Sequence, residues 1–184
     1  MDKDKLKQKF IRGNKKAFDQ IYNDYSSAMY FLCLRYTKNT DEASDIMQDA
    51  FLKIYEKRKQ FNPEKDLSAW IKRIVINTAI DQYKKNKKTV LINDNSFFEA
   101  EAEENELEFD YNGSKEILLK ALQELSTGYR TIFNLYVFEN LTHAEISTFL
   151  NISIGNSKSQ LSRARKALQK VLELNNSIKT KLVK

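Results

Sequence analysis

Cysteine, proline and glycine are scarce in this chain of 184 residues, which contains one, one and four of them in that order. The single cysteine, Cys33, excludes a disulfide framework and a zinc site built on cysteines. It lies in an apolar stretch, so we expect a buried core thiol. Because helix breakers are few and apolar residues recur at three- and four-residue steps, the sequence predicts an all-α fold.

Long apolar runs are also missing, and the N-terminus alternates Lys and Asp where a signal peptide would be apolar. We therefore expect a soluble, cytoplasmic protein that makes no membrane contact. Because the chain has a single histidine, His143, a metal site built on several histidines is excluded. The sequence also has no Ser-His-Asp constellation and no glycine-rich phosphate loop. We expect no catalytic residue, no metal and no cofactor, and a solvent-facing role for His143.

Charge is unevenly distributed along the chain, whose formal net charge is +6. Residues 1–92 hold 20 Lys and Arg against 12 Asp and Glu, and residues 115–184 hold 11 against 5. Residues 93–114 hold 8 acidic residues and no Lys or Arg. This pattern predicts two small helical domains, 1–92 and 115–184, joined by a flexible acidic linker, 93–114. The basic blocks suit a polyanionic partner, or they simply keep the protein soluble.

Residues 141–172 have the layout of a helix-turn-helix, in which two short helices are joined by a tight turn. Thr142 and Glu145 form the capping box T-x-x-E, which predicts a helix beginning at His143. The apolar pattern then breaks, and Ser153 is a good N-cap for a second helix. One face of that second helix consists of Ser157, Leu161, Ala164 and Leu168.

The rest of the second helix carries hydrogen-bond donors that suit base edges and phosphates. In helix-turn-helix proteins this helix enters the major groove of DNA. The candidate DNA-contacting residues are Ser153, Asn156, Lys158, Ser159, Ser162, Arg163 and Lys166. The alternative interpretation is an amphipathic surface helix with a solvated basic face.

Two amphipathic helices are predicted in the N-terminal block, over residues 17–36 and from the start signal at Asn39 to residue 58. The core-facing stripe of the first consists of Phe18, Ile21, Tyr22, Tyr25, Met29, Leu32 and Tyr36. The stripe of the second runs unbroken from Ala43 to Tyr55. Its other side offers Asp45, Gln48, Asp49 and Lys53, which are either solvated residues or a docking face for a partner.

A loop over residues 60–65 contains the turn signal Asn-Pro, and Asp66 or Ser68 then caps a further helix. The polar residues off the apolar stripe of that helix include Lys72, Arg73 and Asn77, and a lysine cluster at its end includes Lys84 and Lys85. Cations beside aromatic and polar side chains suit single-stranded or melted nucleic acid. A lysine-rich helix end favoured by the helix dipole is the alternative.

Three segments in this order resemble the extracytoplasmic-function sigma factors of RNA polymerase, a group of the sigma-70 family. Residues 41–61, DEASDIMQDAFLKIYEKRKQF, resemble the helix that binds core polymerase. Residues 66–88, DLSAWIKRIVINTAIDQYKKNKK, are similar to the segment that melts and reads the minus-ten promoter element. Residues 122–168 are similar to the domain that reads the minus-thirty-five element. The resemblance covers residues 10–172.

The resemblance implies a role for each set of candidate residues. Docking on the polymerase clamp would fall to Asp45, Gln48, Asp49 and Lys53. Capture of a base flipped from the melted minus-ten strand, and contacts beside it, would fall to Phe61, Asn62, Lys65, Lys72, Arg73, Asn77, Lys84 and Lys85. Ser153, Asn156, Lys158, Ser159, Ser162, Arg163 and Lys166 would face the minus-thirty-five duplex. The implied partners are core RNA polymerase, promoter DNA as duplex and as melted strand, and an anti-sigma factor, and the acidic linker would thread the RNA path of polymerase.

One departure from the family pattern lies in the second helix of the helix-turn-helix. Many relatives begin this helix with Gly-Thr-Val-Lys-Ser-Arg, whereas this chain has Gly155-Asn156-Ser157-Lys158-Ser159-Gln160. We expect the loss of an apolar residue at Ser157 to weaken the packing of the helix. Gln160 replaces a cation and is expected to change which DNA sequence is read.

Other kinds of protein share parts of this pattern. A two-domain transcriptional regulator has a similar helix-turn-helix, but the N-terminal block lacks the ligand pocket or phospho-acceptor pattern that a regulator needs. A helical adaptor or anti-factor binds protein alone, and the donor-rich face from Asn156 to Lys166 argues against it. The sequence therefore predicts a promoter-specificity subunit of RNA polymerase that recognises two promoter elements, helps to open the duplex and catalyses nothing itself.

Overall fold

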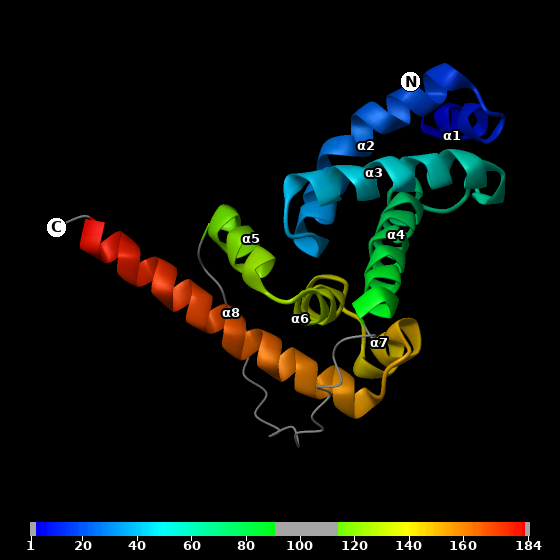
Figure 1. Ribbon diagram of the computed structural model, residues 1–184. Coiled ribbons are helices and arrows are strands. Elements are labelled where there is room, and N and C mark those ends of the chain that lie inside the picture. The colour runs from blue at the N-terminus through cyan, green and yellow to red at the C-terminus, as the bar shows by residue number, and fades with distance from the viewer. Residues whose placement is uncertain (1–2, 91–113, 183–184) are drawn as a thin grey trace. The chain divides into compact units, whose positions relative to one another are not determined.

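The computed structural model describes residues 3–90 and 114–182, and every regular element in these ranges is a helix (Figure 1). The predicted all-α fold is therefore confirmed. The chain divides into two compact units, Met1–Gln82 and Tyr83–Lys184. The predicted acidic linker, residues 93–114, lies outside the described residues except for Ser114, as does the predicted domain boundary at residue 92.

The first unit contains four helical elements and the larger part of a fifth. They are α1 (Lys3–Ile11), α2 (Lys15–Tyr36), α3 (Thr40–Glu56), the short 3₁₀ helix η1 (Lys57–Gln60) and α4 (Leu67–Val90), whose last residues belong to the second unit. α2 and α3 lie side by side, and α1 packs against α2 and η1 (Figure 1). Residues 61–66, between η1 and α4, form a short loop that leads directly into α4 and is called the loop below.

Side-chain caps begin α3 and α4. The Asn39 side chain accepts a hydrogen bond from Glu42 N at 2.8 Å, so the predicted start signal of α3 is confirmed. The Asp66 side chain accepts one from Ala69 N at 2.7 Å, which identifies Asp66 rather than Ser68 as the cap of α4. Each cap satisfies a backbone N–H that has no partner inside the helix.

Two residues of the predicted core stripes are partly open to solvent. Tyr22 of α2 is 43% exposed and Tyr55 of α3 is 36% exposed, so the prediction that they face the core is corrected. Both rings still pack by one edge or face, with ring centroids 4.8 Å apart for Tyr22 and Phe51 and 5.0 Å apart for Tyr55 and Phe18. Both residues lie at the margins of apolar stripes whose central residues are buried. Each stripe covers a wider arc of its helix than the neighbouring helix can cover, so residues at its edge stay partly exposed.

The second unit is built around one long helix. After the end of α4 come α5 (Lys115–Glu124), α6 (Thr127–Phe133), the π-helical turn η2 (Asn134–Phe138), α7 (His143–Leu150) and α8 (Ile154–Leu182). α5, α6 and α7 all pack against α8 (Figure 1). The predicted α8 face is confirmed, and its buried residues are Ser157, Leu161, Ala164, Leu168 and Leu172.

A fully buried arginine links α5 to α6 in the second unit. Arg130 is 0% exposed, and its guanidinium donates to the Gln123 carbonyl at 3.3 Å and to Thr127 Oγ1 at 3.4 Å. The Asn134 side chain donates to the Arg130 carbonyl at 2.9 Å. Because a buried charge is costly without hydrogen bonds, this cluster favours one arrangement of the helices that precede the helix-turn-helix.

Candidate nucleic-acid and protein interfaces

The outer face of α3 presents three of the four residues predicted to dock on a partner. Asp45, Gln48 and Asp49 are exposed there. Lys53 is half-buried, and its Nζ pairs with a carboxylate oxygen of Asp81 on α4 at 3.4 Å. Two carboxylates and an amide are therefore open to a partner, while Lys53 also ties α3 to α4.

An apolar groove lies between α2 and α3, at the edge of this face, and has a volume of about 570 Å³. Its lining includes Tyr22, Gln48 and Leu52. Leu52 is 58% exposed, and it follows Gln48 by four residues, so both lie on one side of α3. The predicted set omits Leu52, although an apolar residue on the polar side of a helix is itself a signal of a contact surface.

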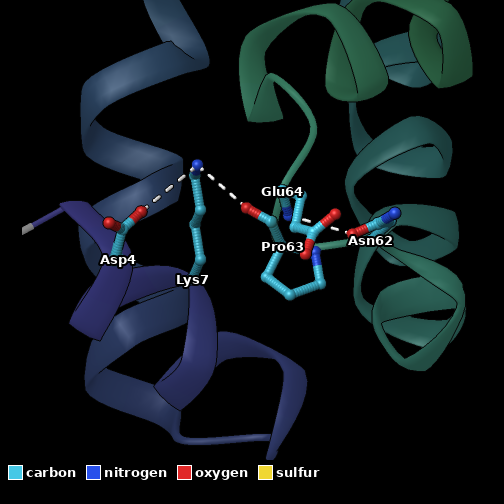
Figure 2. Close-up of polar contacts among 5 residues, drawn as sticks. All are labelled: Asp4, Lys7, Asn62, Pro63 and Glu64. Atoms are coloured by element: carbon cyan, nitrogen blue, oxygen red, sulfur yellow. Dashed lines mark hydrogen bonds and ion pairs between the residues drawn. The ribbon is translucent and has the colours of Figure 1, made fainter.

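The loop between η1 and α4 is shaped by its own hydrogen bonds. The Asn62 side chain accepts one from Glu64 N at 2.9 Å (Figure 2), and the Asn62 carbonyl accepts one from Lys65 N at 3.0 Å. Asn62 and Lys65 are exposed, as contact with DNA requires. Phe61 is only 3% exposed and packs on Trp70, with ring centroids 5.1 Å apart. Its side chain supports the loop from the core, and the predicted contact of Phe61 with DNA stays a prediction.

The predicted DNA-contacting residues of α4 do not all share one face. Arg73 is exposed and Asn77 is half-buried, and their spacing of four residues puts them on the same side of the helix. Lys72 is half-buried and points to a different side. Further along α4, Lys84 is half-buried and Lys85 is exposed. A single ligand can thus contact Arg73 and Asn77 from the same side of α4.

Side-chain hydrogen bonds define the start of each helix in the helix-turn-helix. Thr142 N donates to a Glu145 carboxylate oxygen at 2.8 Å and Glu145 N donates to Thr142 Oγ1 at 3.3 Å, so the predicted capping box is confirmed. The hydrogen bonds from the Thr142 backbone and side chain lower the pKa of Glu145. α7 ends at Leu150, and its C-cap residue, Asn151, has a left-handed φ of 54°. The Ser153 hydroxyl then accepts a hydrogen bond from Asn156 N at 3.0 Å and caps α8, as predicted.

The polar side of α8 is accessible over its first turns. Ser159, Ser162, Arg163 and Lys166 lie opposite the buried stripe, and Asn156 and Lys158 lie at its edges. Of the seven predicted residues, Ser153, Lys158 and Lys166 are exposed and the other four are half-buried. Gln160 Nε2 donates to Asn156 Oδ1 at 2.6 Å, which holds two potential base-reading amides together.

An exposed apolar side chain, Ile154, stands at the start of α8. It is 47% exposed and directly follows the cap residue Ser153. In the major groove such a side chain can contact the methyl group of thymine. The prediction, which considered hydrogen-bond donors, missed Ile154; the sequence signal for it is an apolar residue immediately after an N-cap.

His143 is half-buried and joins three elements, which corrects the prediction that it faces solvent. Its ring stacks on Tyr136 of η2, with centroids 4.6 Å apart, and its Nδ1 lies 2.9 Å from the Ser157 hydroxyl. Ser157 is 0% exposed. The buried Ser157 hydroxyl therefore has the hydrogen-bond partner that buried polar groups need, and that partner, His143, lies on α7.

Groups suited to nucleophilic or metal chemistry are few in the described part of the chain. Cys33 is 0% exposed, which confirms the predicted core thiol, and burial raises its pKa to about 12. Among residues 3–90 and 114–182, His, Cys, Asp and Glu side chains form no group of three or more that could hold a metal ion. None of the described helices is long and apolar enough to span a membrane.

Two family models match the chain, and their order along it is the one predicted from the three segments that resemble sigma factors. The model of sigma-70 region 2 matches residues 21–89, and the model of sigma-70 region 4 matches residues 115–168. The first match includes α3, the loop and nearly all of α4. The second match includes the helix-turn-helix and the polar side of α8.

Individual relatives match over nearly their whole length. The ECF RNA polymerase sigma factor SigW of Bacillus subtilis is 30% identical over 182 residues, which cover 94% of this chain and 97% of SigW. SigM of the same organism is 32% identical over 156 residues, 83% of this chain and 93% of SigM. The sigma-H factor of Pseudomonas aeruginosa is 29% identical over 178 residues, 91% and 92% of the two chains.

Solved structures show the same architecture. The sigma factor RpoE, in its complex with the anti-sigma factor NepR from Bartonella quintana, is 26% identical with a TM-score of 0.50, and the match covers 86% of this chain and 98% of RpoE. CnrH, in complex with the cytosolic domain of CnrY, is 19% identical with a TM-score of 0.50 over 93% and 97% of the two chains. The chain therefore belongs to the sigma-70 family of RNA polymerase sigma factors, within its extracytoplasmic-function (ECF) group.

Proposed function

We propose that this sigma factor docks on core polymerase through α3, reads the minus-ten element with the loop and α4, and reads the minus-thirty-five element with α8. One observation carries the assignment. α3 and α8 each bury one face and leave the other accessible, and the accessible side chains suit protein on α3 and DNA on α8.

The accessible face of α3 has the composition of a protein interface. Leu52, 58% exposed, lies among Asp45, Gln48 and Asp49, and the groove beside it is lined by aromatic rings. Interfaces commonly combine an apolar centre with a polar rim. On this basis Leu52 joins the four predicted docking residues as the apolar anchor, and Lys53 orients the rim through its ion pair with Asp81.

The loop and α4 offer polar groups to a melted strand. Asn62 and Lys65 are exposed on the loop, and Arg73 and Asn77 share one side of α4. Extruding a base from the stack costs a few kcal/mol, and a loop already held in shape loses little further freedom when it binds that base. Phe61 contributes through its buried ring, which supports the loop from below.

α8 offers both phosphate and base contacts in the major groove. Lys158 and Lys166 are exposed cations that suit phosphates, whereas Asn156 and Arg163 are partly enclosed and suit base edges. Ile154 adds an apolar contact at the start of the helix. The Asn156–Gln160 pair is a feature of this chain that would set part of its sequence preference.

The same proposal covers regulation, location and chemistry. The complex of RpoE with NepR supports an anti-sigma factor as a third partner of this chain, besides core polymerase and promoter DNA. A protein that works with polymerase on promoters acts in the cytoplasm. It catalyses no reaction itself, because polymerase supplies the chemistry of RNA synthesis.

Footprinting with and without core polymerase tests the proposal. On a responsive promoter we expect protection of the minus-thirty-five region and reactive, unpaired thymines in the minus-ten region when both proteins are present. The protein alone is expected to give neither signal. Sequence-specific protection by the protein alone, unchanged by polymerase, would instead identify a regulator that acts without a sigma role.

A further inference from the structure

The N-terminal helix α1 is fastened to the loop that precedes α4, although neither the predicted sites nor the interfaces above include α1. Lys7 of α1 extends toward the loop, and its Nζ donates a hydrogen bond to the Pro63 carbonyl at 3.1 Å (Figure 2). The same Nζ pairs with Asp4 Oδ1 at 3.5 Å (Figure 2). The Lys7 side chain is only 18% exposed, so water competes poorly for this bond.

The position of the bonded carbonyl makes the contact specific to the loop. Pro63 lies between Asn62 and Glu64, which form the turn of the loop through the bond from Glu64 N to Asn62 Oδ1 (Figure 2). Because the Lys7 ammonium carries a charge, its bond to the carbonyl is stronger than one between neutral groups. Lys7 thus holds the loop at its midpoint, directly beside the exposed Asn62.

Aromatic packing joins α1 to the same loop from the core side. Phe10 of α1 is fully buried, and its ring centroid is 6.2 Å from that of Trp70 on α4. Trp70 in turn contacts Phe61, the first residue of the loop, at 5.1 Å. α1 therefore holds the loop by two kinds of contact. Phe10 packs on Trp70, which contacts Phe61, and Lys7 donates a hydrogen bond to the Pro63 carbonyl.

The turn after α1 is also seated against the start of the loop. Gly13 has a φ of +81°, and a Cβ added there would lie 3.1 Å from Arg58 Nε of η1. Arg58 itself donates to the Tyr55 carbonyl at 2.8 Å. The positive φ favours glycine where α1 turns into α2, and a Cβ at this position would press on the Arg58 side chain of η1.

We propose that α1 is a positioning element for the promoter-reading loop, and that Lys7 is the positioning residue that sets the Pro63 carbonyl and with it Asn62 and Lys65. The inference rests on the proposed role of this loop in reading the minus-ten element. Loss of the hydrogen bond from Lys7 to the Pro63 carbonyl leaves the fold and the α3 face intact but lets the loop move. Base selection in the minus-ten element then weakens more than polymerase binding does.

The chain supplies its own reporter and its own control. Trp70 is the one tryptophan of the chain and lies beneath the loop, so quenching of its fluorescence by acrylamide, an uncharged quencher, reports how well the loop covers it. Lys7→Met removes the donor and keeps the apolar stem. Lys9→Met makes the same change in charge at an exposed position of the same helix. Lys7→Arg retains a charged donor and serves as the rescue variant.

We expect the quenching constant of Trp70 to rise in Lys7→Met, to stay at the wild-type value in Lys9→Met and to return toward it in Lys7→Arg. In transcription with core polymerase on templates randomised in the minus-ten element, we expect Lys7→Met to compress the ratio between preferred and disfavoured bases about three- to tenfold. Affinity for core polymerase is expected to match that of Lys9→Met.

Two outcomes would overturn the inference. If Lys7→Met and Lys9→Met give equal quenching constants and equal base preferences, the hydrogen bond from Lys7 does not hold the loop. A change in quenching without a change in base preference would reduce Lys7 to a structural role. Should Lys7→Met fail to fold, Lys7→Gln, which shortens the side chain and removes the charge, takes its place in the same comparison, with Lys9→Gln as its control. Absence of promoter-dependent transcription by the wild-type protein would contradict the proposed function, a result distinct from either of these.

Discussion

At the scale of single residues, the contact between the two helices of the helix-turn-helix depends on a polar pair. The Ser157 hydroxyl is buried against α7, and His143 Nδ1 meets it at 2.9 Å. The His143 ring also stacks on Tyr136, and the guanidinium of Arg165 lies 5.6 Å from the centroid of the same Tyr136 ring. The angle between α7 and α8 therefore depends on His143, which was predicted to face solvent, and on Ser157, whose polarity was expected to weaken the packing.

Removing one member of the pair should cost more than replacing both. We expect His143→Leu to lower the free energy of unfolding by about 1–3 kcal/mol, because it leaves the buried Ser157 hydroxyl without this partner. The double variant His143→Leu with Ser157→Val should recover most of that loss, since two apolar groups then meet. Urea unfolding of the full chain, followed by circular dichroism, measures both. Strictly additive losses would contradict the pairing.

Arg163 is the residue of α8 best placed for a base contact, because it is a cation on the side opposite the buried stripe and is partly enclosed. We expect Arg163→Ala to weaken binding of the polymerase–sigma complex to a promoter by ~1–3 kcal/mol and to relax preference at one position of the minus-thirty-five element. Lys170→Ala, an exposed cation further along α8, is the control. A loss that is uniform across promoter sequences would assign Arg163 to a phosphate, and no loss would remove it from the interface.

At the scale of elements, α3 and α8 follow the same plan of one buried and one accessible face, but the accessible faces differ in chemistry. α3 offers carboxylates beside the exposed Leu52, whereas α8 offers lysines, amides and hydroxyls. A surface with carboxylates at its rim disfavours the phosphates of DNA, and a cationic surface favours them. The charge on each face thus separates a protein-binding helix from a DNA-binding one.

Leu52 should contribute to polymerase binding without contributing to the fold. We expect Leu52→Ser to weaken affinity for core polymerase about tenfold or more, since a leucine buried at an interface contributes ~1.5–3 kcal/mol. Thermal stability should hardly change, because the side chain is 58% exposed. Ile154→Ser makes a comparable change on α8 and should leave that affinity near wild type. Equal affinities of Leu52→Ser and wild type for core polymerase would exclude this face as the docking surface.

At the scale of the whole molecule, local signals predicted most of the helical architecture. The caps at Asn39, Thr142 and Ser153 are formed by residues three positions apart or fewer, so the sequence alone locates the helices that they begin. The stripes of α3 and α8 follow from periodicity in the same way. The sides of these helices that are open to partners were therefore predictable before the fold was known.

Contacts between distant residues were not predictable from such signals. Lys7 and Pro63 are 56 positions apart, and nothing in the local pattern of either residue indicates the other. Phe61 follows a polar stretch and precedes Asn-Pro, so it reads as a loop residue, yet packing on Trp70 buries it. His143 reads as a first-turn surface residue for the same reason. In each case tertiary packing decides a question that helical periodicity leaves open.

Run-off transcription shows whether this chain directs RNA polymerase to a specific set of promoters. Purified core polymerase would be assayed with and without the protein on a library of native promoters. We expect discrete transcripts that appear only when the protein is added, from templates that share a minus-thirty-five and a minus-ten element. The same transcripts with and without the protein, or none in either case although the two proteins bind each other, would contradict this expectation.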